Sequence, residues 1–300
     1  MRRRPRRLRR GDVVAVVAPA GPVPDTLLAR GVQLLESWGL RVRVGDRVLA
    51  SHPELNYLAG TDAERAEDFT NAWCDPDVAA VFCARGGYGC LRMVDLLDIP
   101  AVAGASPKVL VGSSDVTVLH ERLAAGLGLP TLFAPMIATG GLQDHPTAAE
   151  RLRRALFEPD ADPLGRGHDP LRPGRAHGVL TGGNVSLLAA TLDVAPPAGA
   201  IALLEEITEE PYRLDRILTQ LLRAGWFANV AGIALGSFTD CGPLGEVRAV
   251  VSDRLIGLGV PIAWEVGFGH CTEAITVPLG VPATLDAEAG TLTPDGPALA

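Results

Sequence analysis

The sequence predicts an α/β protein whose first half forms a parallel β-sheet with helices on both faces. Short runs rich in β-branched residues alternate with amphipathic stretches of helical period in that half. This alternation is typical of parallel strands joined by crossover helices. The 300 residues are 47% hydrophobic and 21% charged, which is enough apolar material for sizeable cores. For the rest of the chain we predict a smaller α/β domain rich in β-structure.

The elements of the first half follow one another in a regular order. Residues 13–18 (VVAVVA) predict a buried strand, and residues 26–38 predict a helix with one apolar stripe. Gly39 follows that helix and is suited to a C-terminal cap. The remaining predicted elements are strands at 41–44, 78–83 and 108–111, a charged amphipathic helix at 61–73 and a helix that ends near residue 127.

A change of composition marks the predicted domain boundary. Residues 157–175 contain four prolines and four acidic residues, with little apolar periodicity. We therefore predict an N-terminal domain (1–155), a linker (156–177) and a C-terminal domain (178–300). The C-terminal domain is expected to contain strands at 201–204 and 233–235, a helix at 213–224 and further β-structure near its end.

The charge is distributed unevenly along the chain. The net charge is −8, yet residues 1–10 contain seven arginines, so the remainder sums to −15. An acidic body argues against a nucleic-acid partner, because phosphate binding needs a basic surface. The arginine arm is predicted to be a solvated tail, with polyanion binding as the alternative.

Targeting and redox signals favour the cytoplasm. The apolar run at residues 13–18 is shorter than a secretory signal requires, and no stretch approaches the ~18 apolar residues of a membrane span. The five cysteines form no C-x-x-C pair and are predicted to be reduced thiols. We predict no membrane partner.

Ser114 is a candidate nucleophile. It lies in KVLVGSSDVTVLH (residues 108–120), where a buried strand turns at Gly112 into a helix. Such a turn exposes a serine hydroxyl beside unpaired helix N–H groups that can bind an oxyanion. However, Val116 stands where G-x-S-x-G has its second glycine. From this segment alone, Ser114 is either a nucleophile or a helix N-cap.

A serine nucleophile needs an adjacent base, and a histidine is predicted for that role. Lys108, the only lysine, lies about 20 Å away along the same strand at ~3.3 Å per residue. Among the six histidines, His270 stands out because small residues precede it and polar residues follow it. Locally, a turn histidine is an equally good interpretation.

The acid that orients the base is expected within LEEITEE (residues 204–210). These carboxylates directly follow an apolar strand, at a sheet end where sites tend to form. A solvated turn is the alternative, and the local pattern does not choose among the four acids.

Taken together, eight segments resemble the LD-carboxypeptidase family of serine peptidases, family S66. The likeness runs from about residue 5 to residue 285. The segments, in order, are LRRGD (8–12), LAGTD (58–62), RGGYG (85–89), GSSDVT (112–117), GGNVSLL (182–188), LEE (204–206), PYRLDR (211–216) and GH (269–270).

The resemblance implies a Ser–Glu–His triad and a Rossmann-like N-terminal domain of the class I glutamine amidotransferase type. Ser114 would be the nucleophile, Glu205 would orient the base, and His270 would be that base. The backbone N–H groups of Gly87 and Asp115 would form the oxyanion hole. Glycine at 87 would then be required, because a side chain there would crowd the substrate carbonyl.

Several residues near the expected cleft have alternative interpretations or depart from the family's pattern. Arg85 is a candidate for binding the free carboxylate of the substrate, with pairing to a structural acid as the alternative. For the glycine loop that follows Arg85, the alternative to an oxyanion hole is an anion-binding turn or a merely tight turn. Phe133-Ala134 departs from the family's His-Gly, which puts substrate detail in question, and Glu206 stands where Asp is common.

The implied activity is that of a muramoyltetrapeptide carboxypeptidase in peptidoglycan recycling. The enzyme would cleave the amide between an L-configured diamino acid and a terminal D-alanine, with no metal or cofactor, as a homodimer. The alternative is the microcin-immunity branch, which hydrolyses peptide- or aminoacyl-nucleotide conjugates. The low aromatic content, 5%, favours murein peptides.

Two other function classes are excluded. A non-catalytic binding module should have lost a triad residue, and none is lost. A dinucleotide-dependent oxidoreductase needs G-x-G-x-x-G after the first strand, where this chain has APAGP (residues 18–22).

Overall fold

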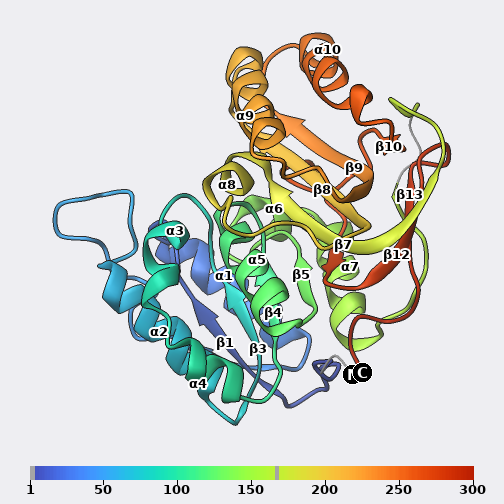
Figure 1. Ribbon diagram of the computed structural model, residues 1–300. Coiled ribbons are helices and arrows are strands. Elements are labelled where there is room, and N and C mark those ends of the chain that lie inside the picture. Colours follow the sequence, from blue (N-terminus) through green and yellow to red (C-terminus); the bar gives the residue numbers. More distant parts are fainter. Residues whose placement is uncertain (1–3, 166–168) are drawn as a thin grey trace.

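The computed structural model describes residues 4–165 and 169–300, which form two β-sheets lying against each other (Figure 1). The first sheet has its central strands parallel, as predicted. Its strands, in spatial order, are β11 (Val277–Leu279), β5 (Thr131–Phe133), β4 (Val109–Gly112), β3 (Val78–Cys83), β1 (Val13–Val17) and β2 (Arg41–Val44).

Helices cover both faces of the first sheet, because its strands are apolar on both sides. Alternate residues of β1 contribute to two separate cores, one on each face. On one face lie α1 (Asp25–Ser37) and α7 (Pro146–Phe157). On the other lie α2 (Asp62–Cys74), α3 (Cys90–Met93), α4 (Ile99–Gly104) and α5 (Thr117–Leu127). A short helix, α6 (Gly140–Gln143), precedes α7.

The second sheet combines parallel and antiparallel strands, which agrees with the predicted β-rich C-terminal half. Its strands, in spatial order, are β10 (Ile262–Ala263), β9 (Val230–Thr239), β8 (Ala200–Ile207), β7 (Arg175–Asn184), β12 (Pro282–Asp286), β13 (Thr291–Pro294) and β6 (Leu164–Gly165). The strands from β7 to β10 are parallel, and the others pair antiparallel.

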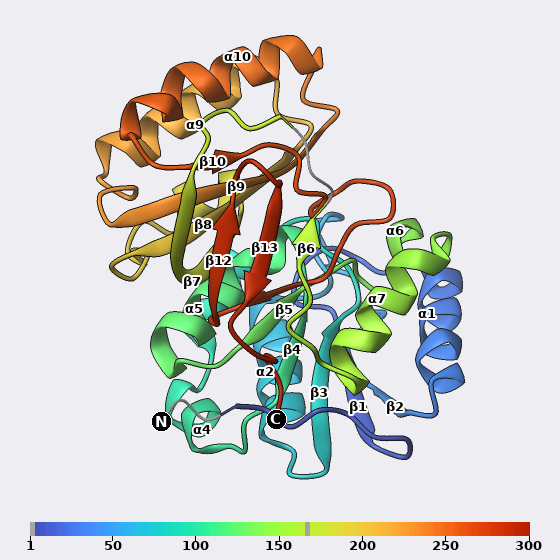
Figure 2. The same ribbon diagram turned by 90° about the vertical axis from the view of Figure 1, so that its right-hand side faces the viewer.

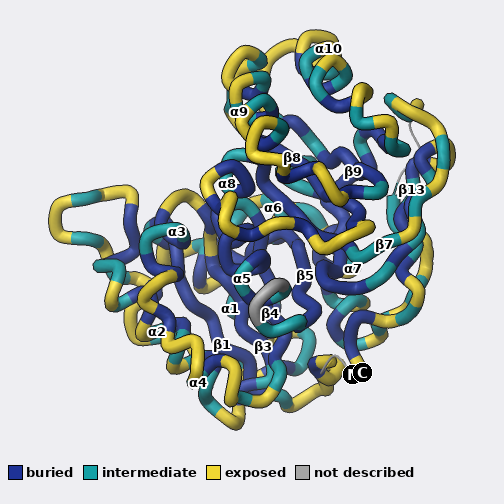
Figure 3. The backbone as a smooth tube through the Cα atoms, in the orientation of Figure 1, coloured by how far each residue is buried: buried dark blue, intermediate teal, exposed yellow. Residues whose placement is uncertain are grey.

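Three helices pack on the outer face of the second sheet (Figure 2). They are α8 (Val185–Ala190), α9 (Pro211–Arg223) and α10 (Leu244–Leu255). The inner face is apolar as well and joins the core of the first sheet, through side chains such as Ile201 and Ala234. The tube coloured by burial shows the central strands of both sheets as largely buried (Figure 3). This shared core fixes the two sheets relative to each other.

The end of the chain contributes to both sheets. After β10 of the second sheet, the chain crosses to the first sheet. There β11 pairs antiparallel with β5, with Val277 opposite Phe133. The chain then returns to the second sheet as β12 and β13. The segment between β10 and β11 therefore bridges the two sheets, and it contains His270.

The arginine arm is attached to the body from Pro5 onward, so the prediction of a tail is wrong for the described part, although the arginine side chains are solvated as predicted. Pro5 and Leu8 are buried. The Arg7 N–H donates to the carbonyl of Ala300 at 2.8 Å, and the Leu8 N–H to that of Leu156 at 2.8 Å. The arginine side chains remain exposed. Residues 1–3 of the arm lie outside the described residues.

Within residues 4–165 and 169–300, no helix has both the length and the apolar character needed to span a bilayer.

Candidate active site

Ser114 occupies a strained turn between strand and helix. It follows β4 and begins a 3-10 helix (Ser114–Val116) that leads into α5, and its φ is +60°. Non-glycine residues adopt this conformation only where the surrounding structure enforces it, and such strain is concentrated at functional sites. Gly112 makes the turn possible, because a Cβ there would lie 2.9 Å from a methyl group of Val116. We call this strand-to-helix turn, residues 112–117, the elbow. Val116, which stands in place of the second glycine, is compatible with it because Gly112 leaves room for its methyl groups.

The alternative role of Ser114, a helix cap, has no hydrogen bond to support it. Within the described residues 4–165, no side-chain cap hydrogen bond is present at the start of the 3-10 helix or of α5. The Ser114 side chain is partly exposed, whereas Ser113 beside it is buried. The hydroxyl of Ser114 is thus available for chemistry.

The glycine loop after β3 lies directly against this serine. A Cβ on Gly86 would meet the Ser114 Cβ at 3.0 Å and its Oγ at 3.1 Å. Gly87 has φ +113°, which favours glycine, and a Cβ there would meet the Gly21 Cα at 3.3 Å. Gly86, which the sequence analysis did not single out, is therefore the glycine that makes room for the nucleophile. Gly87 is needed for its backbone conformation and for its contact with Gly21.

The backbone N–H of Gly87 is free to bind a ligand, since it has no hydrogen-bond partner among the described residues. Asp115, the other predicted oxyanion residue, is buried, and its Oδ2 accepts a 2.7 Å hydrogen bond from the Cys90 N–H. Burial raises the pKa of Asp115, although hydrogen bonds from Cys90 oppose the shift. This contact ties the glycine loop to the elbow and holds both backbones in place.

Glu205 and His270 form a close pair across the second sheet. The His270 Nδ1 lies 2.6 Å from the Glu205 Oε2. The Glu205 side chain is fully buried, and that of His270 is 20% exposed. Burial lowers the pKa of His270, but the charge and hydrogen bond of Glu205, together with the charge of Glu206, outweigh it and raise the pKa above 6.5. With Nδ1 bound to the carboxylate, Nε2 is left to exchange protons.

Glu206 points to a different set of partners, so the structure distinguishes two acids that the local sequence does not. Its carboxylate accepts hydrogen bonds from the Asn184 side chain (2.6 Å), the Ser186 N–H and hydroxyl (2.8 and 2.6 Å) and the Ile207 N–H (2.9 Å). Burial raises the pKa of Glu206 despite these bonds. Glu206 therefore anchors the start of α8, whereas Glu205 faces His270.

One hydrogen bond links the start of α5 to β7, the strand that pairs with the Glu205 strand. The Asn184 N–H donates to Thr117 Oγ1 at 3.1 Å, and Thr117 lies three residues after Ser114. Asn184 is also the register partner of Glu205 on the neighbouring strand. One hydrogen bond and one pair of neighbouring strand residues thus connect the start of α5 with Glu205, the acid that contacts His270. Thr117 and Asn184 were not predicted as site residues, although both lie in the motifs GSSDVT and GGNVSLL.

Arg85 lines an open groove on the other side of the glycine loop. Its guanidinium donates to the Pro22 carbonyl at 2.7 Å, and no acid among residues 4–165 and 169–300 pairs with it. The exposed rings of Tyr57 and Tyr88 lie beside it, with centroids 6.0 Å apart. The groove, of about 560 Å³, is lined by Gly21, Pro22, Val23, Pro24, Asn56, Tyr57, Arg85, Gly87 and Tyr88. None of these residues is acidic, so the groove suits an anionic group.

Phe133 and Ala134 are buried between the sheets and line none of the pockets described in this section. The Phe133 ring contacts the rings of His120 and Phe268, at centroid distances of 5.9 and 6.1 Å. His120 Nε2 lies 2.9 Å from the carbonyl of Gly112. Burial lowers the pKa of His120 to about 4. Both of its ring nitrogens have partners, Thr131 Oγ1 at 2.8 Å and the Gly112 carbonyl, so His120 supports the turn before Ser114. The departure from His-Gly is thus a change in packing.

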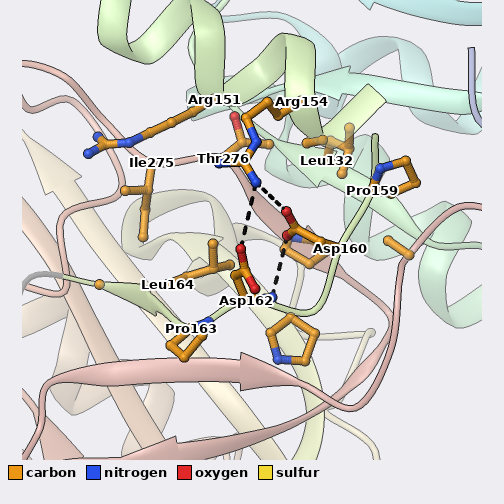
Figure 4. Close-up of a pocket in the computed structure, with 15 residues that line it drawn as sticks. Leu132, Arg151, Arg154, Pro159, Asp160, Asp162, Pro163, Leu164, Ile275 and Thr276 are labelled. Atoms are coloured by element: carbon orange, nitrogen blue, oxygen red, sulfur yellow. Dashed lines mark hydrogen bonds and ion pairs between the residues drawn. The ribbon is translucent and has the colours of Figure 1, made fainter. Parts of the chain in front are cut away.

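A second pocket, of about 280 Å³, lies between α7, β6 and β11 (Figure 4). It contains none of the predicted site residues. Three of its charged groups pair with one another: Arg154 lies 2.6 Å from Asp160 and 3.6 Å from Asp162. Arg151 instead donates to the Glu273 carbonyl at 2.6 Å. Throughout the described part of the chain, no group of three or more potential metal ligands is close enough to hold an ion.

Comparison with known families gives two adjacent matches. Residues 14–134 match the LD-carboxypeptidase N-terminal domain, and residues 177–285 match the LD-carboxypeptidase C-terminal domain. The matched regions contain the elbow, the glycine loop and both members of the Glu205–His270 pair.

Individual proteins agree with these matches. A putative carboxypeptidase of Streptomyces coelicolor is 53% identical, over 99% of this chain and 97% of its own length. A murein tetrapeptide carboxypeptidase of Pseudomonas aeruginosa is 36% identical, over 91% and 92%. Among solved structures, an MccF-like protein from Bacillus anthracis has a TM-score of 0.84 at 22% identity, over 97% of this chain and 98% of its own. That last likeness concerns the fold alone.

Proposed function

The chain belongs to the LD-carboxypeptidase family, and on that premise we propose that it is a serine carboxypeptidase acting on murein tetrapeptides. The bond cleaved would be the amide between an L-configured diamino acid and a terminal D-alanine. The observation that carries the proposal is the 2.6 Å Glu205–His270 pair, together with the strained, positive φ of Ser114 at the turn before α5. The 36% identical murein tetrapeptide carboxypeptidase supports the choice of substrate.

In the first half of the reaction, Ser114 Oγ attacks the scissile carbonyl carbon. Its proton passes to His270 Nε2, and the Glu205 carboxylate stabilises the resulting imidazolium. The backbone N–H groups of Gly87 and Asp115 bind the oxyanion that develops on the carbonyl oxygen. The imidazolium then protonates the amine of D-alanine, which leaves while the peptide stays bound to Ser114 as an ester.

In the second half, water replaces the departed amine. His270, neutral again, takes a proton from that water as its oxygen attacks the ester carbon. The same backbone groups bind the second oxyanion, and the proton returns to Ser114 Oγ as the peptide leaves with a free carboxylate. Every step uses groups of this chain and water.

Arg85 would bind the terminal carboxylate of the substrate. Its guanidinium is exposed, has only the Pro22 carbonyl as a hydrogen-bond partner among the described residues, and lies two residues from Gly87. A guanidinium binds carboxylates through paired N–H groups, and a lysine at this position would not reproduce that geometry. An enzyme that requires a free C-terminus needs such a group beside the scissile bond.

The test compares purified wild-type protein with Ser114→Ala on tetrapeptides that end in L-Lys–D-Ala or meso-diaminopimelate–D-Ala. Release of D-alanine is measured, and we expect Ser114→Ala to lower kcat by about 10⁴-fold or more. Ser113→Ala is the matched control, because its buried side chain is adjacent and has no role in the proposed reaction. If Ser114→Ala and wild type release D-alanine equally slowly, the proposal is wrong.

A second candidate function is hydrolysis of aminoacyl-nucleotide conjugates. The observation that favours it is the exposed Tyr57–Tyr88 pair beside Arg85, since aromatic side chains can stack a nucleobase. An aminoacyl-sulfamoyl adenosine is therefore included as a third substrate. If it is cleaved faster than both tetrapeptides, and Tyr88→Ala removes that preference, the second candidate replaces the first.

A further inference from the structure

Two buried polar atoms beside the candidate triad lack hydrogen-bond partners among the described residues. One is Oε1 of Glu205, the carboxylate oxygen that does not face His270. The other is the hydroxyl oxygen of Ser237 on β9. A buried carboxylate oxygen without a donor is unfavourable, and so is a buried hydroxyl without an acceptor. One atom is an acceptor and the other a donor, so each supplies what the other lacks.

The fold brings these two side chains together. β8 and β9 are neighbouring parallel strands, and their register shifts between Leu204 and Glu206, at the position of Glu205. A Cβ on Gly269 would lie 2.7 Å from Glu205 Oε2 and 2.8 Å from Ser237 Oγ. Both side chains therefore border the same small space, which Gly269 leaves open. Gly269 directly precedes His270, so this space adjoins the backbone that carries the histidine.

We propose that Ser237 is a positioning residue for the Ser114–Glu205–His270 triad, and that its hydroxyl donates a hydrogen bond to the Glu205 carboxylate during turnover. The proposal rests on the proposed function. A rotation of either side chain into the space beside Gly269 would bring the hydroxyl to the carboxylate. Ser237 touches neither the substrate nor the reacting atoms, and acts through Glu205 alone.

The hydrogen bond would have two effects on the Glu205–His270 pair. It fixes the carboxylate plane, so that Oε2 stays aligned with His270 Nδ1. It also satisfies the second oxygen and draws negative charge away from Oε2, because a donor stabilises the charged carboxylate. Without it, the Glu205–His270 pair would hold its shared proton more tightly. Loss of the hydroxyl should therefore raise the pKa of His270. The ring would then stay protonated, and unable to act as a base, up to a higher pH.

The experiment uses the full-length protein and the variants Ser237→Ala and Ser237→Thr. We expect Ser237→Ala to lower kcat about tenfold with KM unchanged, the size of effect typical of a hydrogen bond to a charged group. The low-pH limb of its kcat/KM profile should move to higher pH. Ser237→Thr keeps the hydroxyl and should restore both quantities. ¹H NMR of the His270 Nδ1 proton should show the same titration shift in Ser237→Ala without any substrate.

The control is Thr276→Val, a change that preserves shape. It removes the other buried hydroxyl without a partner among the described residues, which lies in the separate pocket of Figure 4. If Ser237→Ala leaves both the pH profile and the His270 titration unchanged, the proposal is overturned. The NMR readout does not depend on turnover, so the proposal can fail while the carboxypeptidase activity stands. An inactive wild type with a shifted titration in Ser237→Ala would instead overturn the proposed function.

Discussion

The two sides of the candidate site are held in place by different means. On the N-terminal side, the geometry belongs to the backbone: the turn at Ser114, the positive φ of Gly87 and the close approach of Gly86 to the serine. On the C-terminal side, it belongs to side chains: Glu205 and His270 are 65 residues apart in sequence and meet through one 2.6 Å hydrogen bond.

This difference determines how each side should respond to mutation. Apart from the Ser114 hydroxyl itself, the backbone-built side should be sensitive to added bulk rather than to loss of a functional group. The side built from a side-chain pair should lose its function when one charge is removed, even if the shape is preserved. Substitutions on the two sides distinguish these responses.

The largest effect is expected for Glu205→Gln. The amide keeps the shape but removes the charge that stabilises the imidazolium, so kcat should fall by about 10³- to 10⁴-fold. Glu206→Gln is the matched comparison, since this neighbouring buried acid binds Asn184, Ser186 and Ile207 instead of His270. It should retain most activity and lower the free energy of unfolding by about 1–3 kcal/mol. Steady-state kinetics and urea denaturation measure the two effects, and equal loss of activity in both variants would contradict the assignment of roles.

Gly86→Ala tests the backbone side. The new methyl group would lie about 3 Å from the Cβ and Oγ of Ser114, so the serine must move, and kcat should fall roughly 10²-fold. Gly245→Ala in α10 is the control, because its Cβ would meet nothing within 4 Å. Activity assays at equal protein concentration compare them. A Gly86→Ala enzyme as active as the control would show that the loop does not restrict the nucleophile.

The pH dependence probes the electrostatics of the C-terminal side. The pKa of His270 lies above 6.5, and only the neutral ring can accept the serine proton. Activity is therefore lost as the pH falls through that pKa, and kcat/KM should drop about tenfold per unit below it. Initial rates between pH 5 and 9 measure this limb. Glu205→Gln removes the charge that raises the pKa, so its residual activity should persist to lower pH than wild type; a limb that moves upward would contradict this cause.

The smallest effect is expected for Thr117→Val, which breaks the contact between the two sides. The variant keeps the shape of the side chain and loses the hydrogen bond from the Asn184 N–H. It should lower the free energy of unfolding by about 1 kcal/mol, because a buried N–H is left unpaired, and reduce kcat a few-fold. Thermal unfolding and kinetics check both. A loss of activity as large as that of Glu205→Gln would mean that this single contact, rather than the shared core, aligns the two sides.

Local patterns were sufficient for most of the fold. The helix predicted at residues 26–38 forms at Asp25–Ser37, and the strand predicted at 78–83 forms at Val78–Cys83. These elements follow from apolar periodicity and turn residues that are close together in sequence. The return of β11 to the first sheet was not predicted, because strand pairing between distant segments leaves no local signal.

For the candidate site, the sequence alone predicts the buried strand, the turn at Gly112 and the amphipathic helix that place Ser114 on a tight turn. It also offers the acidic run and His270 as candidates, and the resemblance to a family selects Glu205 among the acids. The folded chain adds the partners of each acid: Glu205 faces His270 and Glu206 faces Asn184, at a register shift in the pairing of β8 with β9. Neighbouring strand residues point to opposite faces, and their partners come from segments brought close only by folding.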